Sequence, residues 1–370
     1  MASTARRVSM ADVAARAGVS GQTVSRVVNA SPRVDPVTRA RVEHAMAELD
    51  YRPHRAARAL RTGRTQTIGL VAATLATIGN SRMLQAVADA AAARGYSLVV
   101  VTLGRTADVE ADPIAAAFER LRDQGVDGAI VLNEATALMH DASVPADLRL
   151  VVVDAPDGAR GPGFDGAGGA RGPGFSIVQT DHAAGARVAT EHLLSLGHTA
   201  VHHLAGPARS FSADERERGW RAALVAAGAA VPEPVRGDWT AASGHRLGQR
   251  LAADPAVTAV FAANDQMALG LLRALADAGR RVPEEVSVVG FDDVADAAQY
   301  RPPLTTVRQD FDALGARAVE VLVSGIERGA APVSYTLPAQ LVVRDSAGAR
   351  RAEGFAPSGG PSAPEGTSVG

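Results

Sequence analysis

Two hydrogen-bonding side chains, Gln22 and Arg26, stand four residues apart in the segment VSGQTVSRVVN, residues 19–29. Because positions i and i+4 share one face of an α-helix, a helix here would present an amide and a guanidinium together. The opposite face would carry Val24 and Val27. Such a face can donate hydrogen bonds to a partner, or it is an ordinary solvated surface.

The positive charge of the chain is concentrated in this same region. The 370 residues carry a net charge of −2, and all 38 cationic residues are arginine. Residues 1–64 contain 12 arginines and five acidic residues, a balance of +7, so residues 65–370 carry −9. A basic segment attached to an acidic body is either a solvated arm or the electrostatic footprint of a nucleic-acid binder.

Capping and turn signals predict two short helices around these side chains. Ser9 and Asp12 have the spacing of a capping box, which predicts a helix that begins after Ser9. Gly18 tolerates a positive φ angle and can end this helix. Ser20 can then cap a second helix that runs to about Val28. Two short helices with this connection make a helix-turn-helix.

A third helix is predicted to begin at Asp35 and Pro36, a helix cap followed by proline at the first helical position. Val42, Met46 and Leu49 would give this helix an apolar stripe. The three stretches together predict a three-helix headpiece.

The segments MADVAARAGVSGQTVSRVVN and VDPVTRARVEHAMAELDYRPHRAARAL together resemble the headpiece of the LacI/GalR family of bacterial transcription regulators. The resemblance implies a helix-turn-helix DNA-binding headpiece over residues 8–53, with its second helix in the major groove. There glutamine can pair with adenine and arginine with guanine. It also implies a hinge over residues 54–65, in which Leu60 would wedge into the minor groove, although a flexible basic linker explains the same stretch.

The DNA-contacting positions that the resemblance implies are Ser20, Gly21, Gln22, Thr23, Ser25, Arg26, Asn29, Arg33, His54, Arg55 and Leu60. A related regulator carries a larger side chain at the position of Gly21, so the operator sequence stays open at that contact. The expected partner is double-stranded operator DNA.

From residue 67 the pattern changes to short apolar runs that alternate with helical stretches. The runs TIGLVAA, YSLVVVTL and VDGAIVL are typical of parallel strands that are buried on both faces. A second series begins near residue 182 and includes AVTAVFAAND and VSVVGFDD. The alternation predicts an α/β core of two doubly wound parallel-sheet subdomains, with a ligand cleft at the carboxyl ends of the strands.

The family resemblance continues to about residue 345, through SADERERGW, GDW, AND, GFDD and RQDF. It implies a periplasmic-binding-protein-like core over residues 66–345. One subdomain would span about 66–179 and 310–338, and the other about 180–309 and 339–345. The resemblance also implies a small sugar effector, galactoside-like, that binds between the subdomains and releases the operator.

The effector-contacting positions that the resemblance implies are Thr77, Gly79, Asn80, Met83, Asp154, Arg216, Trp239, Asn264, Asp292, Gln309 and Phe311. Carboxylates, amides and guanidinium groups grip vicinal hydroxyls, and aromatic rings pack on the apolar face of a sugar. Each residue also has an ordinary interpretation as a cap, a surface ion pair or a core side chain. Asp214 and Thr180 replace an arginine and an aromatic residue of a galactoside-binding relative, so the identity of the sugar is open.

Two segments are predicted to lie outside packed structure. The heptapeptide GARGPGF occurs twice, at 158–164 and 169–175, and its glycine and proline content predicts a surface loop near the cleft, with a lid as one open role. The tail, residues 346–370, is expected to be disordered. It lacks the leucine heptads through which a related regulator forms a tetramer, so the resemblance implies a homodimer.

Several other functions find no support in the residues. There is no cysteine, and neither a G-x-S-x-G elbow, a P-loop nor an H-E-x-x-H motif occurs, so we expect no enzyme activity, no cofactor and no metal. The histidines of GHTAVHH would face opposite sides of a strand, which disfavours a shared metal. The absence of a long apolar run and of a secretory signal favours a cytoplasmic protein without a membrane partner.

Three alternatives stay open beside the sugar-released repressor. The first is a regulator of the same family with a different sugar. The second is such a regulator with a purine-type corepressor. The third is a cytoplasmic sugar-binding protein without a DNA role.

Overall fold

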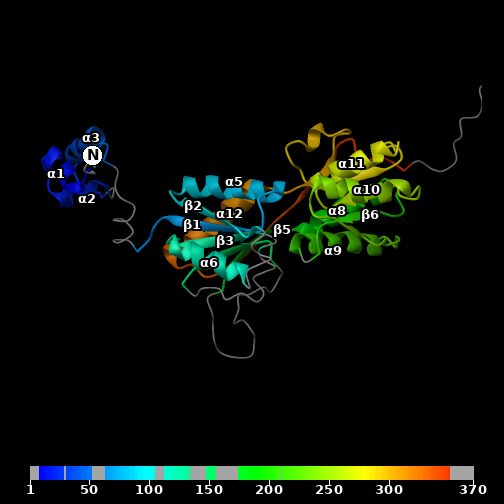
Figure 1. Cartoon of the computed structure of the whole chain (residues 1–370), viewed down its shortest axis with the longest axis horizontal. Coiled ribbons are helices and arrows are strands. Elements are labelled where there is room, and N and C mark those ends of the chain that lie inside the picture. Colours follow the sequence, from blue (N-terminus) through cyan, green and yellow to red (C-terminus); the bar gives the residue numbers. More distant parts are fainter. Residues whose placement is uncertain are drawn as a thin grey trace, which may run out of the picture. The chain divides into compact units, whose positions relative to one another are not determined.

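The chain divides into two compact units, residues 1–67 and residues 68–370, in the computed structural model shown in Figure 1. The residues that the structure describes are 8–28, 31–51, 63–104, 112–132, 135, 147–155, 174–208 and 210–350.

The first unit contains the helices α1 (Met10–Ala17), α2 (Gly21–Val28) and α3 (Pro36–Glu48). The predicted capping box is present: Ser9 N donates to Asp12 Oδ2 at 2.8 Å, and Asp12 N donates to Ser9 Oγ at 3.3 Å. Gly18 ends α1 with a φ of 61°, which is the left-handed conformation that glycine adopts without strain.

The caps predicted for α2 and α3 are also formed. Thr23 N donates to Ser20 Oγ at 3.1 Å, and Thr38 N donates to Asp35 Oδ1 at 2.9 Å. The apolar stripes of the three helices meet in one small core, so the predicted three-helix headpiece is confirmed. The buried residues of that core are Val13, Ala14, Ala17, Val24, Val27, Val34, Val42, Ala45 and Tyr51.

The second unit is built on two six-stranded sheets, as the alternating pattern predicts. The first sheet has the strand order β11-β5-β4-β3-β1-β2. Its strands are β1 (Thr67–Ala72), β2 (Ser97–Thr102), β3 (Gly128–Leu132), β4 (Arg149–Val153), β5 (Ser176–Thr180) and β11 (Ser334–Leu337).

The second sheet has the order β12-β10-β9-β8-β6-β7. Its strands are β6 (His202–Ala205), β7 (Val235–Arg236), β8 (Ala259–Ala262), β9 (Ser287–Asp292), β10 (Thr305–Arg308) and β12 (Gln340–Val342). Strands β6 to β10 pair in parallel, and β12 runs antiparallel to β10 at the edge. We refer to the two sheets with their helices as the first and second subdomains.

Helices cover both faces of the first sheet, which explains why its strands are apolar at every position. In β3, Ile130 and Leu132 belong to the cluster that contains α5 (Ile78–Ala93) and α12 (Phe311–Arg328). The alternate residues Ala129 and Val131 belong to the cluster that contains α6 (Pro113–Asp123). A strand buried on both sides has no face for polar residues.

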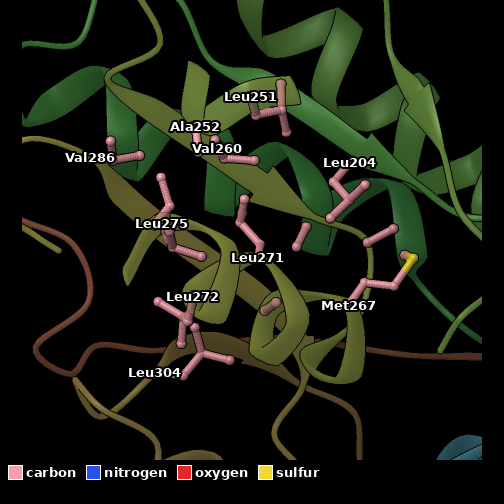
Figure 2. Packing of buried hydrophobic residues seen from close by; sticks show 14 of the residues in the cluster. Leu204, Leu251, Ala252, Val260, Met267, Leu271, Leu272, Leu275, Val286 and Leu304 are labelled. Atoms are coloured by element: carbon pink, nitrogen blue, oxygen red, sulfur yellow. The ribbon is translucent and has the colours of Figure 1, made fainter. Parts of the chain in front are cut away.

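The second sheet is covered in the same way. Helices α8 (His182–Ser195) and α9 (Phe211–Ala226) pack on one face, and α10 (Ala241–Ala253) and α11 (Asp265–Asp277) pack on the other. The short 3-10 helix η3 (Ala297–Gln299) adds Ala297 to the latter cluster. Figure 2 shows Leu271 and Leu275 of α11 against Leu204 of β6 and Val260 of β8.

The chain passes between the two subdomains three times. It leaves the first sheet after β5, returns after β10 to form α12 and β11, and leaves again to form β12. Strand β11 pairs with β5 of the first sheet, and β12 pairs with β10 of the second. Residues far apart in sequence therefore build each subdomain.

The expectation of a disordered tail from residue 346 is wrong for residues 346–350. Ser346 is fully buried, and its Oγ donates to Val288 O at 2.6 Å and accepts from Thr305 N at 2.8 Å. Arg350 N donates to Leu196 O at 2.9 Å. Residues 346–350 are part of the second subdomain because Ser346 satisfies the backbone of two of its strands, and the rest of the tail lies outside the described residues.

None of the helices in the described part of the chain is both long and apolar enough to cross a bilayer.

Leu271 and Leu269 of α11 provide a matched test of this packing. Leu271 is fully buried and Leu269 is 41% exposed. We expect Leu271→Ala to lower the free energy of unfolding by about 2–5 kcal/mol, because it leaves a cavity in the core. Leu269→Ala should change it by less than about 1 kcal/mol.

Both tryptophans, Trp220 and Trp239, lie in this subdomain, so tryptophan fluorescence during denaturant unfolding reports its stability. Equal losses for the two variants would contradict the packing.

Candidate functional site

The outer face of α2 is available for contact within the first unit. Gln22 and Arg26 are exposed, whereas Val24 and Val27 on the other side of the helix are buried. A Cβ at Gly21 would meet nothing within 4 Å. The sequence-based division of this helix into a core side and a polar outer side is therefore what the structure contains.

The remaining predicted DNA contacts fall into two groups. Ser20 and Arg33 are exposed, and Thr23 and Ser25 are half-buried. Four further positions lie outside the described residues: Asn29, His54, Arg55 and Leu60.

A cavity in the second unit brings together all eleven residues that the sequence singled out for an effector. The space between the lining atoms is about 440 Å³, a volume that includes open solvent at the mouth. The lining residues are Thr77, Gly79, Asn80, Met83, Asp154, Ser212, Arg216, Trp239, Asn264, Asp292, Gln309, Phe311 and Leu314.

The polar groups of the cavity stand where strands end. Asp154 follows β4, Asn264 lies shortly after β8, Asp292 is the last residue of β9, and Gln309 follows β10. Two of these residues have positive φ angles, 59° at Asp154 and 116° at Asp292. Non-glycine residues in this conformation store backbone strain, which is concentrated at functional sites in proteins.

The guanidinium of Arg216, on α9, is the centre of the polar network. It donates to Ala263 O, and Nη2 lies 3.5 Å from Asp292 Oδ1. Its Cζ atom stands 3.9 Å from the centre of the Phe291 ring and 5.4 Å from that of Trp239. Only 4% of this arginine is exposed, so its charge is balanced by a carboxylate, by carbonyl oxygen and by aromatic faces.

Asp292 is buried opposite Arg216. Burial raises the pKa of its carboxyl, and the positive charge of Arg216 together with a hydrogen bond from Gln309 acts in the opposite direction. Gln309 Nε2 donates to Asp292 Oδ1 at 2.7 Å. The carboxylate, the amide and the guanidinium are thus held as one hydrogen-bonding group.

Trp239 forms an aromatic wall that a neighbouring glycine makes possible. A Cβ at Gly206 would overlap the indole ring of Trp239. Asn264 Nδ2 donates to Trp239 O at 3.1 Å, while Asn264 Oδ1 accepts from Met267 N at 2.9 Å and caps α11. Asn264 therefore has both the role of a helix cap and a place in the cavity wall.

The first subdomain contributes residues from the beginning of α5. Thr77 caps this helix through Asn80 N at 3.4 Å, and Asn80 Nδ2 donates to Thr74 O at 2.9 Å. A Cβ added at Gly79 would lie 4.0 Å from the ring of Phe311. Met83 and Phe311 belong to the buried apolar cluster of this subdomain, so this wall is mixed polar and apolar.

Sequence reasoning missed Ser212 and Leu314, which also line the cavity, and His182, which contacts its charged residues. His182 Nε2 lies 3.0 Å from Asp154 Oδ1, and Arg216 donates to His182 Nδ1 at 3.3 Å. A histidine at the first position of a helix after a buried strand is the signal that could have found it, since helix starts after parallel strands face ligand sites.

The histidines of GHTAVHH are separated, and no cluster of residues in the described ranges could hold a metal ion. His198 bonds to Thr258 Oγ1 and Ser287 Oγ. His203 stacks between Trp220 and Phe261 and donates from Nδ1 to Phe261 O at 2.9 Å. Burial lowers the pKa of His203 to about 4, so the ring is neutral near pH 7.

Known protein families match residues in each of the two units. Residues 9–54 match the lacI family of bacterial regulatory proteins, and residues 190–347 match a periplasmic binding protein-like domain. The lactose operon repressor of Escherichia coli is 38% identical over 344 residues, which cover 91% of this chain and 90% of that protein. This chain belongs to the lacI family.

A further relative and a solved structure show how far this family likeness extends. The HTH-type transcriptional regulator CelR of Thermobifida fusca is 37% identical over 350 residues, which cover 92% of this chain and 98% of that protein. A crystal structure of the lac repressor dimer bound to operator and the anti-inducer ONPF has a TM-score of 0.78 at 34% identity, covering 93% of this chain and all of that one. The chain is a lacI-family DNA-binding transcriptional repressor.

Gly206→Ala tests the close packing of Trp239. We expect the added methyl group to displace the indole, which is 7% exposed, and to expose it to water. In a Trp220→Phe background, Trp239 emission should shift to longer wavelength and become more accessible to acrylamide.

Gly21→Ala, where a Cβ meets open space, is the matched control and should leave the emission unchanged. An unshifted spectrum for Gly206→Ala would show that the ring does not depend on this contact.

Proposed function

We propose that this repressor binds its operator through α2 and releases it when a small saccharide binds in the cavity between the two subdomains. The observation that carries the proposal is the composition of that cavity. Two carboxylates, a guanidinium, three amides and two aromatic residues converge in it. Such a set grips the hydroxyls of a sugar and packs on its apolar face.

An unpaired donor in the cavity wall supports a ligand that offers hydrogen-bond acceptors. Trp239 Nε1 is buried, and no hydrogen-bond partner for it exists among the described residues. A buried N–H without an acceptor costs about 1–3 kcal/mol. A sugar oxygen beside the ring would remove this cost.

The headpiece supplies the DNA contacts of the proposal. Gln22 and Arg26 stand one turn apart on the exposed face of α2. This spacing suits bidentate pairing with adenine and guanine in the major groove. We further propose Leu60 as the minor-groove wedge of the hinge and a homodimer as the assembly, so that two headpieces read adjacent half-sites.

Galactosides are the first effectors to test. The lactose operon repressors of Escherichia coli and Klebsiella pneumoniae are 38% and 36% identical to this chain. Other relatives carry the names ribose operon repressor and HTH-type transcriptional repressor PurR, at 34% and 32% identity. Operator binding at fixed salt, measured with galactosides, cellobiose, ribose and purines, separates these effectors.

The expected result is a 5- to 150-fold weaker operator affinity with the correct sugar, which corresponds to a coupling of about 1–3 kcal/mol. Tighter operator binding in the presence of a purine would refute release by a sugar and would indicate a purine corepressor instead.

Arg26→Ala tests base reading by α2. Loss of a bidentate arginine should cost about 1–3 kcal/mol of specific affinity and relax the preference at one base pair of each half-site. Arg41→Ala removes the same charge from an exposed position on α3 and is the matched control. Selection from a randomised operator library, with dissociation constants at fixed salt, gives both quantities. Identical base preferences for the two variants would refute readout by Arg26.

Asp292→Asn tests the sugar site. The variant loses the charge that faces Arg216 at 3.5 Å, so we expect sugar affinity to fall at least tenfold, which is about 1.4 kcal/mol. Operator affinity without sugar should stay within about twofold.

Asp296→Asn, at an exposed position nearby in sequence, is the control and should respond to sugar like the unmodified protein. If both variants respond normally, the effector does not use Asp292.

A further inference from the structure

His182 is almost fully enclosed, at 1% exposure, between charged groups of both subdomains. It is the first residue of α8, which packs on the second sheet. On one side of the ring stands Asp154, at the end of β4 in the first sheet, and on the other stands Arg216 of α9. The imidazole therefore lies between two effector-cavity residues that belong to different subdomains.

The chemistry of Arg216 fixes the state of the ring. A guanidinium has only donors, and its Nε and Nη2 atoms lie 3.4 and 3.3 Å from His182 Nδ1. Nδ1 must therefore carry the lone pair, which places the proton of the neutral ring on Nε2. The Nε2 atom lies 3.0 Å from Asp154 Oδ1.

The contact with Asp154 is less well aligned than the contact with Arg216. Nε2 is buried and makes no hydrogen bond of good geometry within the described ranges. The neighbours of the ring are the charged groups of Asp154, Arg216 and Asp292 and the aromatic rings of Phe211 and Phe291. Asp154 is thus the carboxylate that faces Nε2–H, at 3.0 Å.

We propose that His182 is a positioning residue whose two nitrogens have separate tasks. Nδ1 orients the guanidinium of Arg216 and thereby sets the affinity for the effector. Nε2–H holds Asp154 and thereby links the effector cavity to the relative arrangement of the subdomains. The inference rests on the proposed function, because it names the contact through which an effector bound in the cavity would influence the first subdomain.

Two substitutions separate the tasks because each retains one nitrogen's chemistry. Asparagine places an amide oxygen near the position of Nδ1 and can accept from Arg216, but it does not reach Asp154. Glutamine places its amide near the position of Nε2 and can reach Asp154, but it offers no acceptor at Nδ1. His182→Ala removes both contacts. His192→Gln, on the same helix α8, is the control for an amide at a different histidine.

Two quantities are measured on the full-length protein. One is the dissociation constant for methyl β-galactoside, with cellobiose as the second probe, from tryptophan fluorescence. The other is the factor by which the saturating sugar weakens operator binding. For His182→Asn we expect sugar affinity within about threefold of the unmodified protein and an operator-release factor reduced at least fivefold. For His182→Gln and His182→Ala we expect sugar affinity to fall at least tenfold, the loss typical of a hydrogen bond to a charged group.

A purely structural role predicts a different result. Both quantities would then fall together in all three variants, in the order of their thermal stability. That result overturns the inference, and so does unmodified behaviour of both His182→Asn and His182→Gln. His192→Gln should leave both quantities unchanged.

The tautomer provides a test that does not depend on the sugar. In ¹⁵N NMR spectra of the protein without ligand, His182 should show a protonated Nε2 and an unprotonated Nδ1, assigned by its absence from the spectrum of His182→Asn. A proton on Nδ1 would overturn the inference. If neither sugar binds to the unmodified protein while this tautomer is found, the effector proposal fails and the histidine contacts stand.

Discussion

A buried guanidinium needs partners on every side, and Arg216 imposes this requirement on the whole effector cavity. Its charge is met by Asp292, Ala263 O, His182 and the face of Phe291. Removing one partner of such a group leaves an uncompensated buried charge, which is strongly destabilising. The strand ends that carry these partners must therefore keep their relative positions.

The backbone shows how these positions are kept. Asp292 has a φ of 116° and Trp239 one of 71°, and both are held by contacts outside themselves. Gln309 binds the carboxylate of Asp292, and Asn264 binds the carbonyl of Trp239. Strained residues persist when the surrounding structure determines them fully. In the second-subdomain wall of the cavity, the polar groups accordingly already bond to one another.

A further buried carboxyl, that of Asp265, lies in the second subdomain. Asp265 Oδ1 accepts from Thr306 Oγ1 at 2.5 Å, and Oδ2 accepts from Val294 N at 2.9 Å. Burial raises its pKa well above the usual range, and the charge of Asp292 acts in the same direction. A raised pKa in the folded state means that ionisation of Asp265 opposes folding. The second subdomain therefore loses stability as the pH rises from the pKa of this carboxyl in the unfolded chain toward its higher pKa in the folded chain.

Local signals determined what the sequence could predict. The caps at Ser9, Ser20 and Asp35 depend on neighbours within three residues, so they were readable before any tertiary contact was known. The apolar strands were equally plain because burial on both faces leaves little alternation. The tail boundary was wrong because Ser346 looks like the start of a polar tail, whereas its hydroxyl completes the hydrogen bonding of two strands.

The residues of the effector cavity also fall into those that the sequence could identify and those that only the folded chain reveals. Family resemblance identified eleven lining residues, but composition and spacing alone could not have chosen among the many aspartates that follow strands. His182 was missed because its importance comes from Asp154 and Arg216, which are 28 and 34 residues away along the chain. Ser212 and Leu314 look like ordinary first-turn helix residues, and only the folded chain places them beside the other lining groups.

The third passage of the chain between the subdomains has a consequence for biosynthesis. Strand β11 (Ser334–Leu337) is the last strand of the first sheet, and α12 (Phe311–Arg328) covers one of its faces. The first subdomain therefore lacks a sheet edge, and the part of its apolar cover that α12 shares with α5, until the ribosome has passed residue 337. The second subdomain waits nearly as long for β12, so both subdomains complete their sheets only after residue 342 has been synthesised. Until then the apolar strands β4 and β5 are at risk of aggregation.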